Sequence, residues 1–214
     1  MSESFQTIIE KLSENYSVQS LIPNTATFIF ILESPHVQEL KHQAPIAGSS
    51  GKTMTTKLLG ETYNQPLGLL IKQNLEVRNY ETLLNKIGVM NVSNIPLQRK
   101  AYNDEQLVHR YESFFTLLEK IRTTNEKTTY ASEKLNELQC ILLSRFNSEL
   151  EKLLDRKCTI IPCGRFAQKF LKLSTVRGED WTIIHNIPHP SYNSWNQAKY
   201  KQKIDELLQA FIYR

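Results

Sequence analysis

The feature that most constrains this chain is a short apolar run that stops abruptly in a polar turn. Residues 28–32 read FIFIL, in which aromatic and β-branched side chains follow one another without a polar position. A strand with one face in water would alternate, so this run predicts a strand covered on both faces, as in a parallel sheet. In the next segment, Glu33-Ser34-Pro35-His36, the proline cannot continue a strand ladder. These polar residues are therefore expected in a loop at the carboxyl end of the strand, where open α/β sheets bind ligands.

Strand-like and helix-like segments alternate along the rest of the chain. Further strands are predicted at residues 87–92, 159–162 and 181–187. Helices are predicted at residues 3–16, 53–59, 67–75, 104–122, 132–154, 164–173 and 196–212. This alternation indicates the α/β class, with a single-domain, three-layer α/β/α arrangement over residues 1–214 and a central, mainly parallel four-stranded sheet. The two long helices at about 104–154 form an insertion between the second and third strands.

Composition sets broad limits on function and location. The net charge of +4 permits a polyanionic partner without requiring one. Three cysteines without a Cys-x-x-Cys pair favour a reducing, cytoplasmic setting over a disulfide framework. The N-terminal segment contains acids and lacks a long apolar core, which argues against a signal peptide, and no apolar run approaches the length of a membrane span. We therefore expect a cytoplasmic protein with no membrane partner.

Polar groups follow each predicted strand. The first strand is followed by Glu33, the second ends near Asn91, the third runs into Gly164-Arg165, and the fourth leads to His189 and Ser191. Because the carboxyl ends of parallel neighbours meet at one edge of a sheet, we expect these groups to converge in one cleft. A carboxylate, an amide and an imidazole in one cleft can activate water, read an amide-bearing ligand and stabilise a developing anion.

These segments together resemble the uracil-DNA glycosylase superfamily. The segment Glu33-Ser34-Pro35-His36 resembles the motif GEAPG of the iron–sulfur branch, and Glu39 falls where that branch has a second acid. Residues 45–51 (PIAGSSG) are similar to PFVGRAG, and Asn91 stands like the asparagine that ends the second strand. Residues 160–167 (IIPCGRFA) resemble the strand–Gly–x–x–Ala step, and residues 189–194 (HPSYNS) resemble HPSPLS. The matches occur in order from residue 28 to residue 194.

The resemblance implies hydrolysis of the bond between a base and its deoxyribose, with the base flipped out of DNA. Glu33 would orient water and favour the sugar cation, and a neutral His189 would donate a hydrogen bond to the base carbonyl as it gains charge. Asn91 would read the pairing edge of a pyrimidine. Each of the three also has a structural interpretation: a surface acid or helix cap, a satisfied loop histidine, and a turn-forming asparagine.

The remaining site residues follow from the same motifs. The predicted substrate-binding residues are Ser34, Pro35, His36, Ile46, Ala47, Gly48, Ser49, Ser191 and Tyr192. The predicted DNA-binding residues are Ser50, Gly51, Lys52, Arg165, Asn193 and Trp195. Ser191 and the backbone of residues 47–51 would hold phosphates, with Lys52 nearby or simply solvated. Tyr192 and Trp195 are candidates to fill the gap left by a flipped nucleotide, although Trp195 could instead pack under the final helix.

The chain also departs from the superfamily pattern. His36 stands in place of the usual glycine or tyrosine, Ile46 in place of a phenylalanine that stacks on the base, Ser34 in place of an aspartate, and Asn193 in place of a wedge leucine. The cysteines do not match the iron–sulfur spacing, so we expect no cluster, no metal and no other cofactor.

Uracil is the leading expected substrate, only slightly ahead of a modified pyrimidine such as those of some phages. DNA is the expected partner, and the protein is expected to be a monomer.

Two other function classes fit parts of the sequence. Gly51-Lys52-Thr53 suggests a nucleotide-binding phosphate loop, but the pattern needs glycine where Ile46 stands, and the preceding strand ends too far upstream. The other alternative is a catalytically silent, DNA-binding member of the same fold.

Overall fold

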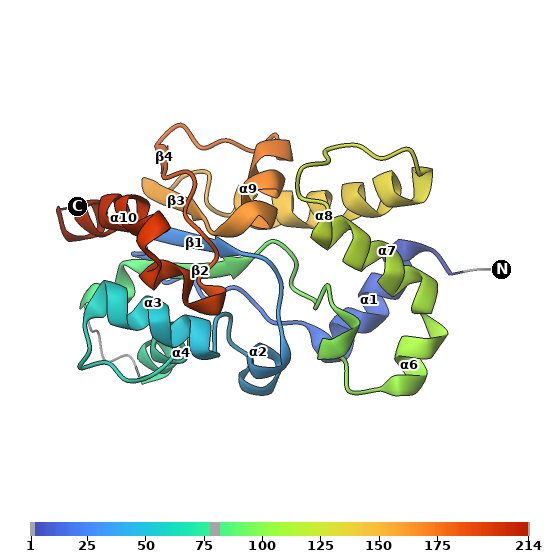
Figure 1. Cartoon of the computed structure of the whole chain (residues 1–214), viewed down its shortest axis with the longest axis horizontal. Helices are drawn as coiled ribbons and strands as arrows, with labels where there is room; N and C mark the ends of the chain where they lie inside the picture. The colour runs from blue at the N-terminus through green and yellow to red at the C-terminus, as the bar shows by residue number, and fades with distance from the viewer. Residues whose placement is uncertain (1–2, 78–81, 214) are drawn as a thin grey trace.

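The computed structural model describes residues 3–77 and 82–213, and it is built around a four-stranded sheet (Figure 1). The strands are β1 (Phe28–Leu32), β2 (Ile87–Asn91), β3 (Cys158–Pro162) and β4 (Trp181–Ile183). All neighbouring strands are parallel, in the order β2-β1-β3-β4. The prediction of an α/β fold with a four-stranded, mainly parallel sheet is therefore confirmed.

The strand register brings the carboxyl ends of the strands to one edge. Leu32 pairs with Asn91 across β1 and β2, and Ile31 pairs with Pro162 across β1 and β3. The strand order reverses between β1 and β3, because β2 lies on one side of β1 and the later strands lie on the other. Such a reversal opens a crevice at the carboxyl ends, where ligands of α/β folds bind.

Helices cover both faces of the sheet. Their bounds are α1 (Phe5–Tyr16), α2 (Val37–His42), α3 (Ser49–Leu59), α4 (Leu67–Val77), α5 (Thr82–Asn85), α6 (Glu105–Arg110), α7 (Glu112–Thr123), α8 (Glu133–Glu151), α9 (Gly164–Leu173) and α10 (Lys201–Tyr213). Short 3-10 turns lie at η1 (Arg99–Ala101), η2 (Ser191–Asn196) and η3 (Ala198–Tyr200). Among the described residues, no helix is both long and apolar enough to cross a membrane.

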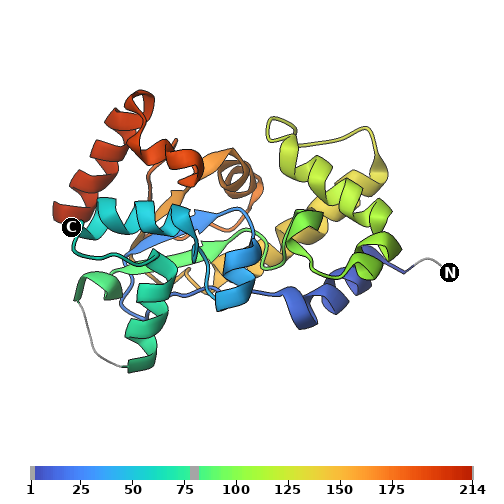
Figure 2. The same ribbon diagram turned by 60° about the horizontal axis from the view of Figure 1, so that its bottom comes forward.

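The side chains of β1 divide the core into two halves. Phe28, Phe30 and Leu32 pack with residues of α3, α4 and α10 on one face. Ile29 and Ile31 pack on the other face with residues of α1, α7, α8 and α9. All five residues of β1 are buried, which is why its sequence shows no polar alternation. Figures 1 and 2 both show α6 and α7 gathered with α1 at one end of the molecule, beside the sheet edge that carries the strand ends.

Several predicted element bounds are wrong, each for a local reason. The helix predicted at residues 104–122 is interrupted at Tyr111, whose backbone is not helical, so that α6 and α7 are separate. The strand predicted at residues 181–187 ends at Ile183, and beyond it Ile187 forms only an isolated bridge with Cys163. Asn186 lies between them with a positive φ of 63°, which is incompatible with a continuous strand.

The helices α2, α3 and α10 differ from the prediction. α2 was not predicted; its first turn is fixed by Glu39, whose carboxylate accepts a hydrogen bond from the backbone N–H of His36. α3 begins at Ser49 rather than at residue 53. The sequence prediction starts it too late because the first turn consists of small residues, which are also typical of a loop. α10 begins at Lys201, after two 3-10 turns, rather than at residue 196.

Candidate active site

A cleft of about 870 Å³ lies at the carboxyl edge of the sheet. Its walls come from the ends of β1 and β2, from α2, α3, α7 and α9, and from the segment that follows β4. Glu33, Asn91 and His189 all line it, although they lie far apart in sequence. The three predicted catalytic side chains therefore face one cleft, at the crevice that the strand order creates.

Most of the predicted binding residues also line this cleft. They are Ser34, His36, Ile46, Gly48, Ser49, Ser50, Arg165, Ser191 and Tyr192. Tyr192 is the most exposed of them, with 96% of its surface accessible. It lies in η2, where Tyr192 and Asn193 both have positive φ values, of 55° and 53°. This unusual backbone pair holds the Tyr192 ring out from the rim of the cleft.

The other predicted residues do not line the cleft. Pro35, Ala47 and Gly51 are buried, and Lys52 and Asn193 are exposed outside it. Trp195 is only 2% exposed; its Nε1 donates a hydrogen bond to the Pro188 carbonyl, and its ring lies 6.2 Å from that of Phe30. Pro35, Ala47 and Trp195 therefore have their side chains in the protein interior, and for Trp195 this is the packing alternative named above. The expectation that the backbone of residues 47–51 holds phosphates stays a prediction.

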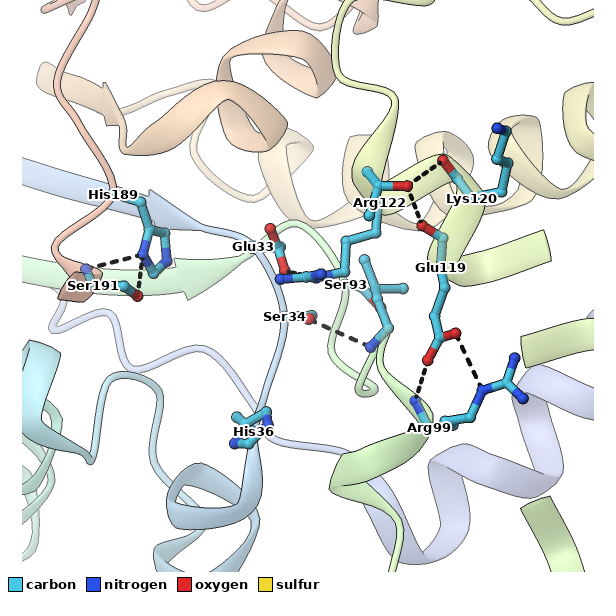
Figure 3. Close-up of polar contacts among 12 residues, drawn as sticks. Glu33, Ser34, His36, Ser93, Arg99, Glu119, Lys120, Arg122, His189 and Ser191 are labelled. Carbon is cyan, nitrogen blue, oxygen red and sulfur yellow. Dashed lines mark hydrogen bonds and ion pairs between the residues drawn. The ribbon is translucent and has the colours of Figure 1, made fainter. Parts of the chain in front are cut away.

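His189 is held in a defined orientation by the residue two positions later. Its Nδ1 lies 3.2 Å from the backbone nitrogen and 2.7 Å from Oγ of Ser191 (Figure 3). A backbone N–H can only donate, so Nδ1 accepts and the proton of the neutral ring is on Nε2. Burial, together with the nearby charge of Arg122, lowers the pKa of His189 to about 4. His189 is therefore a neutral hydrogen-bond donor near pH 7.

The loop that carries His189 approaches β3 closely. A Cβ atom on Gly164, which has a positive φ of 87°, would lie 2.8 Å from Cβ of His189. The backbone nitrogen of Gly164 also donates a hydrogen bond to the carbonyl of Ile187. Glycine at this position lets the segment after β4 lie against the end of β3, which places the imidazole in the cleft.

Asn91 presents an unsatisfied acceptor. Its Nδ2 lies 3.5 Å from Oε1 of Glu39, whereas its Oδ1 is buried and has no hydrogen-bond partner among the described residues. The residue is only 6% exposed, and it lines the cleft. Buried acceptors without a partner are costly in folded proteins, and such an oxygen in a cleft favours a ligand that offers a donor.

Glu39 fixes a loop that lines the cleft. Its carboxylate accepts hydrogen bonds from the backbone nitrogens of His36, at 2.9 Å, and Ile46, at 2.6 Å. Ile46 has a positive φ of 52°, which is a strained conformation for a β-branched residue. Burial raises the pKa of Glu39 to about 7, and the hydrogen bonds act in the opposite direction. Because backbone donors occupy both of its oxygens, Glu39 is a poorer candidate for activating water than Glu33.

Glu33 is positioned by contacts from two directions. Its backbone carbonyl accepts a hydrogen bond from the nitrogen of Ser93, which extends the pairing of β1 and β2 past the strand ends. Its side-chain Oε1 accepts a hydrogen bond from Nε of Arg122 at 2.5 Å (Figure 3). Burial raises the pKa of the Glu33 carboxyl, and the charge and hydrogen bond of Arg122 act in the opposite direction.

Sequence reasoning missed part of the cleft wall. The unpredicted polar residues are Gln38, Gln98, Arg122, Gln168, Asn186, Ser194, Gln197, Lys199 and Tyr200, and Glu39 was noted without a role. Arg122 comes from the inserted helices, 89 residues from its partner Glu33, and no local pattern indicates that contact. The spacing of Glu39, three residues after the helix cap His36, is by contrast a usable signal for a helix start.

The described residues include no group of three or more histidine, cysteine, aspartate or glutamate side chains that could hold a metal ion. Gly51-Lys52-Thr53 lies within α3, and α2 separates it from β1. A phosphate loop connects a strand directly to the helix it precedes, so this arrangement differs from one. In comparisons with known proteins, no protein-family model matches the chain, and no curated protein matches it in sequence.

Proposed function

We propose that the protein is a DNA glycosylase, which hydrolyses the N-glycosidic bond of a flipped uracil or modified pyrimidine in DNA. The observation that carries the proposal is the convergence of Glu33, Asn91 and a neutral His189 in one cleft. The ordered resemblance to the uracil-DNA glycosylase superfamily assigns the same three residues to this chemistry. Both arguments support a proposal in which a carboxylate, an amide and a neutral imidazole act on one substrate.

The proposed reaction separates charge, and His189 and Glu33 each stabilise one of the two charges that form. When the bond between the sugar C1′ and the base nitrogen breaks, its electron pair stays on the base, and the sugar becomes cationic. Nε2–H of His189 donates a hydrogen bond to the base carbonyl, on which negative charge grows. The Glu33 carboxylate stabilises the cation and accepts a proton from the water that attacks C1′. The departing base takes up a proton from solvent, which completes the balance.

The cleft supports a pyrimidine ligand. Oδ1 of Asn91 needs a donor, and a uracil-type edge offers its ring N–H while a cytosine-type edge offers its amino group. Ile46 is 5% exposed and lines the cleft, so it presents a small branched surface where a flat ring would be expected in the superfamily. Uracil is the first proposed substrate, and a modified pyrimidine is the second.

The cleft also carries features suited to DNA. Arg165 and Lys199 line it and supply positive charge for phosphates. The first turn of α3 adds Ser49 and Ser50 at a helix N-terminus, where backbone N–H groups favour anions. Contacts of this kind release counterions, so binding to DNA is expected to weaken steeply as salt increases.

A strand-nicking assay after alkali treatment tests the proposal. The substrates are duplexes that carry uracil or different modified pyrimidines, and the proteins are the wild type and Glu33→Gln. We expect nicking at one or more of these bases by the wild type, and much slower nicking by Glu33→Gln with DNA binding retained. DNA binding without nicking of any substrate would instead identify a catalytically silent member of the fold.

A further inference from the structure

The inserted helices contribute a cation, Arg122, to the cleft wall. Arg122 lies in the last turn of α7, and its side chain extends toward the end of β1, where Nε donates to Oε1 of Glu33 (Figure 3). The two side chains are about 30% and 20% exposed. An ion pair with that degree of burial is screened less than one on the surface, so its charge matters to both partners.

Two nearby sets of contacts link the segment that carries Glu33 to the helix that carries Arg122, through residues 97–99. Oγ of Ser34 accepts a hydrogen bond from the backbone nitrogen of Leu97, which ties the loop after β1 to the loop after β2. Two residues later, Arg99 donates to Glu119 from its backbone nitrogen at 3.0 Å and from its Nε at 3.1 Å. Glu119 precedes Arg122 by one helical turn of α7. Figure 3 shows Ser34 close to the Glu33 carboxylate, and Glu119 and Arg99 on the side of the view away from His189.

We propose that Arg122 is a positioning residue for the proposed glycosylase reaction, which holds the Glu33 carboxylate in place with one oxygen bound and the other open to water. The inference rests on the proposed function. Oε1 is occupied by Arg122, and no described residue donates a hydrogen bond to Oε2. The helical insertion thereby becomes part of the active site, because it supplies the counter-ion of the catalytic carboxylate.

Ionisable side chains from several segments line the cleft with Glu33, and they allow an effect of the Arg122 charge to be distinguished from simple packing. Arg122 approaches from α7, Glu39 from α2, Arg165 from α9 and His189 from the segment after β4. Among the described residues, Arg122 alone bonds the Glu33 carboxylate. Burial raises the pKa of this carboxyl, and Arg122 opposes that rise. Loss of Arg122 should therefore move the proton uptake of Glu33 to higher pH, whereas loss of packing alone would not.

The test is the pH dependence of single-turnover base release by the wild type, Arg122→Gln and Arg122→Lys. We expect the acid limb of the Arg122→Gln profile to move to higher pH, with a loss at least about tenfold larger at low pH than at high pH, the size expected when one opposite charge is removed. Arg122→Lys should restore most of the limb. Lys120→Gln removes a charge from the same helix turn, but from an exposed side chain outside the cleft, and should leave the profile unchanged.

A loss of rate that is equal at every pH would overturn the inference, and so would a profile that Arg122→Lys does not restore. Carbon-13 NMR titration of the Glu33 carboxyl in wild type and Arg122→Gln gives a readout that needs no activity. If Glu33 titrates at the same pH in both, Arg122 does not position it. An inactive wild type with a shifted Glu33 titration would refute the proposed function while leaving the ion-pair role supported.

Discussion

The backbone nitrogen of Ser191 lies 3.2 Å from Nδ1 of His189 and thereby determines which ring nitrogen carries the proton. With Nδ1 accepting, Nε2–H is the donor that remains for a ligand. Because the pKa of His189 is lowered to about 4, this donor is neutral over the whole physiological range. A neutral imidazole held in this orientation can donate a hydrogen bond to the base carbonyl as negative charge grows on it.

Replacement of His189 should therefore slow the chemistry strongly. We expect His189→Ala to reduce the single-turnover rate of base release by roughly tenfold to a thousandfold, the scale for losing one preorganised donor. The wild-type rate should show no step at the ordinary histidine pKa, since the ring is already neutral there. His185→Ala is the matched control, because His185 is exposed and lies outside the cleft. Equal rates for His189→Ala and the wild type would remove His189 from the mechanism.

The raised pKa of Glu39 predicts a specific dependence of stability on pH. Between its ordinary pKa of 4.5 and its folded value of about 7, the folded state binds more protons than the unfolded state. This group's contribution to stability is thus fully present below about pH 4.5 and is lost as the pH rises through about 7.

Thermal unfolding of the wild type and Glu39→Gln measures this effect. The melting temperature of the wild type relative to Glu39→Gln should fall by at least about 2 °C between pH 4.5 and pH 8, since the variant cannot titrate at this position. The exposed acid Glu14, in α1, provides the control substitution Glu14→Gln, for which no such trend is expected. A difference that stays constant across this range would contradict the raised pKa of Glu39.

Tyr192 is expected to act on the DNA helix rather than on the chemistry. Its ring is 96% exposed at the rim of the cleft, where it can stack in the gap left by a flipped nucleotide. Tyr192→Ala should slow base release from duplex DNA by roughly tenfold, the scale of one aromatic stacking contact, and have a smaller effect on single strands. Tyr213→Ala, at the end of α10, removes a similarly exposed ring outside the cleft and should change neither rate. Equal losses on both substrates would exclude the proposed wedge.

The sheet could be predicted from the sequence because its signals are local. The all-buried pattern of β1 follows directly from FIFIL, and the polar residues at the strand ends follow from parallel topology. Trp195 could not be resolved in the same way, because an aromatic residue in a loop suits both stacking and packing. Its burial depends on two contacts. Phe30 is distant in the chain, and the hydrogen bond to the Pro188 carbonyl depends on the geometry of the loop.

The central ion pair lay beyond sequence reasoning. Arg122 is one of several basic residues on an amphipathic helix, and nothing in its neighbours distinguishes it from a solvated charge. Its approach to Glu33 depends on where α7 packs, which the bond between Arg99 and Glu119 helps to fix. The left-handed backbone of Ile46 was equally hidden, because a β-branched residue seldom adopts it without a partner such as Glu39.

The most direct test of the account is the detection of free base by mass spectrometry after incubation with duplexes that contain uracil or a modified pyrimidine. We predict that the wild type releases free base from at least one duplex, and that Glu33→Gln and Asn91→Ala each release it at least about tenfold more slowly while still binding DNA. If no free base appears from any of the duplexes, or if both variants release it as fast as the wild type, the cleft does not perform this reaction.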